Sequence, residues 1–130
     1  MIYLAIALGG AIGALSRYGM MNLVGQVVTQ SPAPWNTFPW GTLLVNLLGS
    51  LAIGMVYVLF AEKMLLSAEV RALVVVGMLG AFTTFSTFSL DTILLIEQGW
   101  IGQAVLYTLA SVVFCVLAVW LGMALMRLLA

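Results

Sequence analysis

The stretch GMLGAFTTFSTFS, residues 77–89, carries the side chains best suited to bind an ion. Phe85 and Phe88 are three positions apart, so on a helix they share one face, where aromatics usually just pack. The edge of an aromatic ring is positive, and hydroxyls are hydrogen-bond donors. Such a lining strips water from a small anion without trapping it behind a full positive charge, as conduction requires. Five hydroxyl residues occupy seven positions here: Thr83, Thr84, Ser86, Thr87 and Ser89.

Polar side chains in other apolar stretches are further candidates. Asn46 lies deep in a second apolar run, where its amide either clasps a neighbouring helix or donates to an ion in a pore. Tyr107, Ser111 and Cys115 recur every four residues and form one mildly polar stripe. This stripe is either a helix contact or one wall of a narrow path. Arg17 either extends to the lipid headgroups or attracts anions into a vestibule.

The middle of the hydroxyl run leaves two conformations open. Gly77 and Gly80 precede it, and with Thr83 and Thr84 they favour a helix that is broken near its middle. A break at membrane depth frees backbone carbonyls and amides, and it survives only where it lines a cavity or binds an ion. The alternative is an intact helix whose hydroxyls bond to the preceding turn and whose glycines pack against a neighbour.

The composition indicates that a lipid bilayer surrounds these side chains. Hydrophobic residues make up 65% of the chain and charged residues 6%, whereas soluble domains have roughly 45–50% and about 25%. Four Lys and Arg balance four Asp and Glu, so no basic patch indicates a nucleic-acid partner. The absence of histidine excludes His-based metal sites, His-dependent triads and imidazole proton relays. We therefore do not expect an enzyme.

Four stretches are apolar and long enough to cross a bilayer, which takes about 20 helical residues. Prolines in the connection 26–38 end the first helix and delay the second. Ser67 favours the start of the third helix, and EQGW at 97–100 predicts a tight turn. The expected fold is an all-α membrane protein in which residues 1–130 form a single domain. The predicted helices are roughly 2–24, 39–60, 70–96 and 101–127.

The few charges give a weak orientation signal. An even number of helices places both termini on one side, together with Lys63, Arg71 and Arg127. Arg17, near the far end of the first helix, is the one opposing cation in the sequence. Cytoplasmic segments carry an excess of Lys and Arg, so the count mildly favours cytoplasmic termini. So small a bias leaves room for insertion in both orientations.

Three segments resemble the signature segments of the Fluc/CrcB family of fluoride channels: GGAIGALSRY at 9–18, GTLLVNLLGS at 41–50 and GAFTTFSTFS at 80–89. The resemblance covers essentially the whole chain. It implies an antiparallel, dual-topology homodimer with two fluoride pores in the inner or plasma membrane of a bacterium or archaeon. It also implies a structural sodium ion at the dimer interface, held by the backbone carbonyls of Gly80 and Thr83. Oxygen ligands suit such a hard cation.

The same resemblance implies which side chains form the fluoride path. Two positions depart from the family pattern. Asp91 stands where a glutamate is usual, which shortens the reach of the carboxylate near the end of the pore. Cys115 stands where a serine is common in the polar stripe of the last helix. The residues implied for the path are Arg17, Thr42, Asn46, Phe85, Ser86, Thr87, Phe88, Tyr107 and Ser111.

Passive fluoride export is the function that these features favour. The sequence has no nucleotide-binding motif, so no energy-coupled step is expected. One alternative is a small proton-coupled exporter built as a four-helix dimer, which would need a titratable acid in its binding cavity. Asp91, beside the hydroxyl run, supports that coupling poorly. A structural subunit of a larger complex is the other alternative, and it would leave the hydroxyl cluster without a purpose.

Overall fold

The computed structural model describes residues 1–33, 35–63 and 66–129, apart from the side chain of Lys63. Pro34 and residues 64–65, which belong to two of the predicted connections, lie outside the described residues. Four helices in the described part are long and apolar enough to cross a membrane. They are Ile2–Val28, Trp40–Glu62, Ala68–Glu97 and Ile101–Leu129. The predicted all-α class and its four apolar helices are therefore confirmed.

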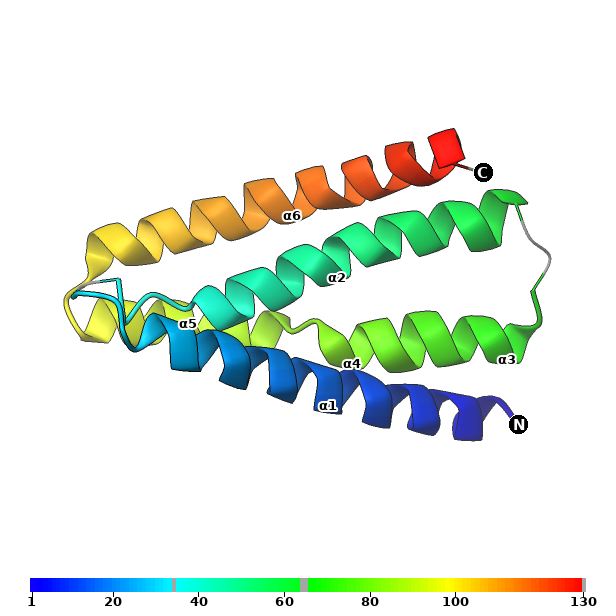
Figure 1. The fold of residues 1–130 in the computed structure, drawn as a ribbon, viewed down its shortest axis with the longest axis horizontal. Helices are drawn as coiled ribbons and strands as arrows, with labels where there is room; N and C mark the ends of the chain where they lie inside the picture. The colour runs from blue at the N-terminus through cyan, green and yellow to red at the C-terminus, as the bar shows by residue number, and fades with distance from the viewer. Residues whose placement is uncertain (34, 64–65, 130) are drawn as a thin grey trace.

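Consecutive spans run in opposite directions, and both termini lie at the same end of the bundle (Figure 1). The first span is α1 (Ile2–Val28), and the second is α2 (Trp40–Val58) followed by the π-helical turn η1 (Leu59–Lys63). The fourth span is α6 (Ile101–Leu129). The third span consists of α3 (Ala68–Arg71), the π-helical η2 (Ala72–Leu79), α4 (Gly80–Phe82) and α5 (Phe85–Glu97).

The helix ends follow local sequence signals, with one difference. The Ser67 side chain accepts a hydrogen bond at 3.4 Å from a backbone amide in the first turn of α3, as expected for an N-cap. Gly99 has a φ of 82° in the turn before α6, a conformation that favours glycine. The first helix, predicted over roughly 2–24, continues to Val28, because no proline occurs before Pro32. Arg17 therefore lies well inside α1 and not near its end.

Glycines allow two pairs of helices to approach closely. α1 packs on η2, where a Cβ at Gly9 or Gly13 would collide with backbone carbonyls of η2. α2 packs on α6 in the same way, because a Cβ at Gly54 or Gly122 would collide with the backbone of the other helix. Small residues favour helix association in membranes, where close packing replaces the hydrophobic effect. These two contacts fix the frame in which the polar residues meet.

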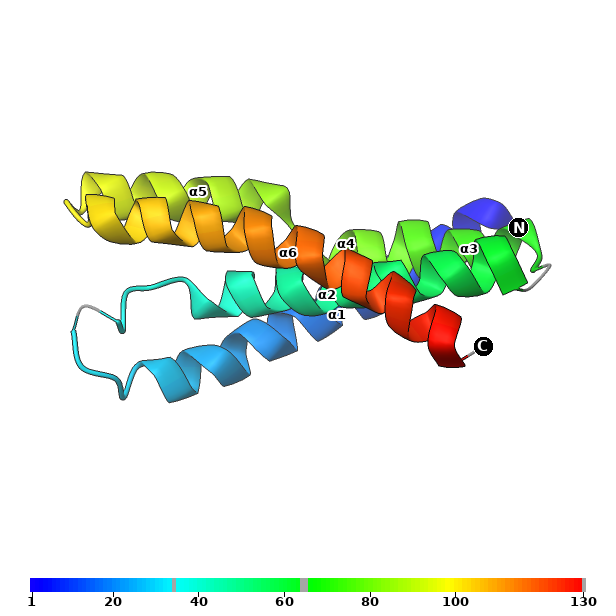
Figure 2. The same ribbon diagram turned by 90° about the horizontal axis from the view of Figure 1, so that it is seen from above.

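The third span changes its neighbour where its helix is interrupted. Thr83 has φ −80° and ψ 158°, and Thr84 has φ −154° and ψ 117°, so both residues are extended. Before them, η2 and α4 lie against α1, and after them α5 lies against α6. Figure 2 shows α5 beside α6, beyond this interruption. The two extended residues fall at the position for which the sequence allowed either a broken or an intact helix.

Candidate ion path

Asn46 of α2 holds the interruption of the third span with both polar atoms of its side chain. Its Oδ1 accepts a hydrogen bond from the Thr84 amide at 2.8 Å, and its Nδ2 donates one to the Thr84 carbonyl at 3.0 Å. In a continuous helix these two backbone groups would bond within the helix. Asn46 therefore replaces the hydrogen bonds that the interruption removes. One N–H of the amide remains, because a carboxamide carries two donor hydrogens.

Thr84 also organises the hydroxyl run at the start of α5. Its Oγ1 accepts a hydrogen bond from the Thr87 amide at 3.1 Å, which makes Thr84 the N-cap of this helix. The same oxygen lies 3.0 Å from Thr87 Oγ1 and 3.2 Å from Ser86 Oγ. Ser89 instead donates to the Phe85 carbonyl in the preceding turn at 2.9 Å. Part of the hydroxyl run therefore stabilises α5 itself.

A cavity of about 400 Å³ lies beside the interruption. Its lining includes Asn46, Thr84, Phe85, Phe88 and Ser111. The centroids of the two phenylalanine rings are 5.3 Å apart, as expected for neighbours on one helix face. Phe85 is 78% exposed in the single chain, whereas Phe88 is 9% exposed. No charged side chain among the described residues lines this cavity, so its polar lining consists of hydroxyl, amide and thiol groups and ring edges.

The hydroxyl of Ser111 is buried in the wall of this cavity. Ser111 is 7% exposed, and its Oγ has no hydrogen-bond partner among the described residues. A buried polar group without a partner costs about 1–3 kcal/mol, so it usually serves a water, an ion or a functional step. Cys115, one turn further along α6, lines the same cavity. Tyr107, one turn earlier, is fully buried between helices.

Asp91 joins residues of α2 and α6 further along the third span. Its Oδ2 accepts hydrogen bonds from Thr42 Oγ1 at 2.6 Å and from the Tyr107 hydroxyl at 3.4 Å. Asp91 and Thr42 also line a second cavity, of about 230 Å³, whose lining comes mainly from the end of α1 and the start of α2. The rings of Phe88 and Tyr107 have centroids 5.3 Å apart. A series of contacts thus links Phe88, in the lining of the first cavity, through Tyr107 to the carboxylate in the lining of the second.

Arg17 reaches the interruption from α1. Its Nη1 donates a long hydrogen bond of 3.4 Å to the carbonyl oxygen of Thr83. In a continuous helix the Thr87 amide would donate to this carbonyl, and the Thr84 amide would donate to that of Gly80. The Thr87 amide donates instead to the Thr84 hydroxyl, and the Thr84 amide donates to Asn46. The interruption thus removes from both carbonyls the partner that a continuous helix supplies.

The structure gathers the predicted path residues into three groups. The first cavity brings together Asn46, Phe85, Phe88 and Ser111, whereas Thr42 and Tyr107 meet at Asp91, and Ser86 and Thr87 surround Thr84. Arg17 lines neither cavity, but it donates to the carbonyl of Thr83, which lines the first cavity.

The path residues implied by the family resemblance did not include Thr84 or Asp91, although the sequence placed Thr84 in the hydroxyl run and Asp91 near the end of the pore. A threonine three residues before Thr87 fits an N-cap, and this spacing was the available signal for Thr84. A carboxylate inside an apolar span is rare and commonly functional, which was the signal for Asp91.

The structure is that of a helical membrane protein in which buried polar groups line cavities within the spans, an arrangement typical of channels and transporters. More narrowly, this chain belongs to the CrcB family, because residues 4–123 match the family described as "CrcB-like protein, Camphor Resistance (CrcB)". The predicted family is therefore confirmed.

Individual relatives have similar chains over most of this sequence. The chain is 48% identical over 123 residues to the fluoride-specific ion channel FluC of Magnetococcus marinus, covering 95% of each chain. It is 47% identical over 123 residues to FluC of Hahella chejuensis, covering 95% of this chain and 92% of the relative. It is 49% identical over 127 residues to FluC of Methylococcus capsulatus, covering 97% of this chain and 53% of the relative. The relatives are named as ion channels and not as enzymes, as predicted.

Proposed function

We propose that this protein is a fluoride-selective, passive ion channel that exports fluoride from the cytoplasm and so confers fluoride resistance. Relatives at 47–49% identity are named fluoride-specific ion channels. The observation that carries the proposal is the unpartnered Ser111 hydroxyl, which lines the same cavity as the rings of Phe85 and Phe88. A hydroxyl donor and positive ring edges suit a small anion that accepts strong hydrogen bonds. Without a cation in this lining, the anion binds weakly enough to leave.

The path continues from the first cavity past Phe88 and Tyr107 to Asp91. Asp91 accepts hydrogen bonds from Thr42 and Tyr107 through one oxygen, Oδ2. Both donors are hydroxyls, and a hydroxyl hydrogen can rotate to a new acceptor. Fluoride that arrives beside them competes with the carboxylate for these donors, and the second cavity lies beyond.

The acid–base chemistry of fluoride explains why a cell needs such a pore, and the membrane potential drives the anion through it. Hydrogen fluoride is a weak, membrane-permeant acid that ionises in a near-neutral cytoplasm, where the anion is trapped. A membrane potential is worth about 2.3 kcal/mol per charge per 100 mV, so it expels the anion through an open pore without ATP.

The functional unit that we propose is an antiparallel homodimer in the inner or plasma membrane of a bacterium or archaeon. The exposure of Phe85 supports a second subunit, because 78% of this large apolar side chain is uncovered beside a cavity. A structural sodium ion at the interface fits the Gly80 and Thr83 carbonyls, which lack their usual helical donors. When bound there, sodium supplies the positive charge that these carbonyl dipoles attract.

Anion efflux from liposomes tests the proposed function. Purified protein is reconstituted in liposomes loaded with potassium fluoride or potassium chloride, and a potassium ionophore starts the efflux. Rapid fluoride release with little chloride release is the expected result. Similar release of both anions would contradict selectivity, and fluoride release that requires a proton gradient would favour a coupled transporter. No fluoride release from folded protein would overturn the proposal.

A further inference from the structure

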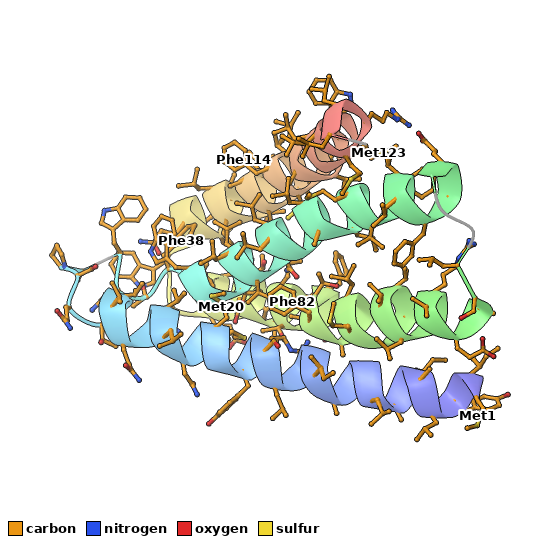
Figure 3. All side chains as sticks on the ribbon, turned by 45° about the vertical axis from the view of Figure 1, so that its right-hand side comes forward. Met1, Met20, Phe38, Phe82, Phe114 and Met123 are labelled. Carbon is orange, nitrogen blue, oxygen red and sulfur yellow. The ribbon has the colours of Figure 1, made fainter. Side chains whose placement is uncertain are left out.

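The connection between α1 and α2 places one aromatic side chain inside the bundle. Phe38, in this connection, is 4% exposed. It belongs to a buried cluster with Phe88, Leu95, Ala104 and Tyr107, which come from α5 and α6. Figure 3 shows Phe38 at the end of the bundle, beside the first turns of α6. A residue of the first connection thus packs directly against residues of the last two helices.

Phe38 extends a series of ring contacts that begins in the first cavity. Phe85 contacts Phe88, and Phe88 contacts Tyr107, in both pairs with ring centroids 5.3 Å apart. Tyr107 then meets Phe38 at 5.6 Å with an interplanar angle of 84°, which is an edge-to-face contact. Such contacts prefer a defined ring orientation. The orientation of the Tyr107 ring is therefore set from two sides, by Phe88 and by Phe38.

The connection is attached on both sides of this contact. Thr37 Oγ1 donates to Gln103 Oε1 at 3.5 Å, and Gln103 lies one turn before Tyr107 on α6. On the other side, the ring of Trp40, which begins α2, lies 4.5 Å from that of Phe38. The packing of Trp40 on Phe38, more than the long hydrogen bond of Thr37, holds the Phe38 ring against Tyr107.

The hydrogen bond of Tyr107 does little to fix its own ring. The distance from its hydroxyl to Asp91 Oδ2 is 3.4 Å, longer than the usual range of about 2.5–3.0 Å for bonds between oxygens. Asp91 is held separately by Thr42 at 2.6 Å. Packing of the rings therefore directs the Tyr107 hydroxyl toward the carboxylate together with this long bond.

We propose that Phe38 is a positioning residue of the ion path, which acts by fixing the orientation of Tyr107 and thereby of its hydroxyl. This inference rests on the proposed fluoride conduction, in which that hydroxyl is a donor at the passage to the second cavity. Phe38 also lines the second cavity together with Thr42 and Asp91. The aromatic ring of a connecting segment thus controls a side chain of the path from outside the four spans.

Phe38→Leu tests the proposal, because leucine fills part of the space but offers no ring edge. The initial rate of fluoride efflux from liposomes is measured for matched amounts of dimeric protein. We expect the rate to fall roughly three- to tenfold, the population change that corresponds to the loss of one aromatic pair. Phe114→Leu is the matched control, since Phe114 is 53% exposed on the outer side of α6 (Figure 3) and should leave the rate unchanged.

A double-mutant cycle with Tyr107→Phe separates positioning from a general loss of structure. Tyr107→Phe keeps the ring and removes the hydroxyl. If Phe38 acts by directing that hydroxyl, Phe38→Leu causes no further loss of efflux in the Tyr107→Phe background. Equal losses in both backgrounds would overturn the inference, because a merely structural effect is additive.

The efflux rates of Phe38→Leu and of the wild type also distinguish failure of this inference from failure of the proposed function. Wild-type efflux in Phe38→Leu would overturn the inference and leave the proposed function intact, whereas absence of efflux from the wild type would overturn both. If Phe38→Leu does not assemble, Phe38→Met provides the same comparison, since its flexible side chain fills the space without a ring.

Discussion

Asn46 and Thr84, 38 residues apart, are joined by two hydrogen bonds. The side-chain amide of Asn46 bonds both the backbone N–H and the backbone carbonyl of Thr84. This pairing matches the donor and acceptor that a helix interruption exposes. It also gives Asn46 a structural task in addition to its place in the cavity lining. Thr84 is 8% exposed, so its backbone depends on Asn46 for hydrogen bonding. The interruption of the third span is therefore held by the second span.

Replacing Asn46 with leucine is expected to reduce both stability and fluoride efflux. The change leaves the amide and carbonyl of Thr84 without these partners, and each unsatisfied buried group costs about 1–3 kcal/mol. The Tm of the purified protein in detergent should fall, and liposome efflux should be lost. Asn22→Leu is the matched control, because Asn22 is exposed on α1. A Tm equal to that of the wild type would contradict the structural role of the pairing.

Asn46→Asp separates the two hydrogen bonds. The carboxylate can still accept from the Thr84 amide, but it cannot donate to the Thr84 carbonyl. We expect fluoride efflux to be lost while the dimer still assembles, with a Tm between those of the wild type and Asn46→Leu. Efflux comparable to the wild type would count against a role for this amide in the path.

Replacing Phe85 and replacing Phe88 are expected to affect the stability of the protein differently, although both side chains line the cavity. Phe85 is 78% exposed in the single chain, so Phe85→Ile should change subunit stability by less than about 0.5 kcal/mol while reducing efflux strongly. Phe88 is 9% exposed and packs on Tyr107, so Phe88→Ile should reduce stability as well. Thermal unfolding and efflux of both variants are measured together. Full efflux in Phe85→Ile would remove this ring from the path.

Ser111→Ala is expected to reduce efflux without reducing stability. The Ser111 hydroxyl has no hydrogen-bond partner among the described residues, so its removal breaks no bond inside the subunit. Removal of an unsatisfied buried group is neutral or stabilising. Thr108→Ala is the control, since the Thr108 hydroxyl bonds within α6 to the Ala104 carbonyl at 2.8 Å. A Tm decrease with normal efflux would be the reverse of the expected pattern.

Cys115→Ser is expected to raise the rate of efflux. Cys115 lines the same cavity one turn beyond Ser111, and a thiol is a weak hydrogen-bond donor. A hydroxyl there adds a stronger donor to the path. Single-channel current or initial efflux rate measures the change, and a decrease would indicate that this position lies outside the path.

Replacing sodium in the buffer should lower the thermal stability of the assembled protein. If the carbonyls of Gly80 and Thr83 bind sodium, occupancy stabilises the native dimer according to the sodium concentration. We expect the Tm to fall when sodium chloride is replaced by N-methylglucamine chloride at equal ionic strength. The Arg17 contact with Thr83 places a second cation near this carbonyl, so Arg17→Gln should strengthen the sodium dependence. A Tm that is independent of sodium would contradict the proposed site.

Several features were predictable because they depend on local sequence. The lengths of the apolar stretches predicted the four spans, because a helix bonds its own backbone amides and carbonyls and can therefore cross lipid. The Ser67 cap and the turn at Gly99 followed from residue chemistry within a few positions. The ring pair Phe85 and Phe88 followed from helical spacing. The three family segments also appeared in order, and the family match over residues 4–123 confirmed the resemblance.

The tertiary structure decided which distant residues meet. Asn46 and Thr84 are 38 positions apart, Thr42 and Asp91 are 49 apart, and Arg17 and Thr83 are 66 apart. No local period relates such positions, because their contacts depend on how glycine-lined helices cross and on where the third span changes its neighbour. Phe38 carried no signal in the sequence, since burial of a ring in a connection depends on the helices around it. The sequence by itself determined the spans and the chemistry of their side chains, whereas helix packing determined the path that those side chains form.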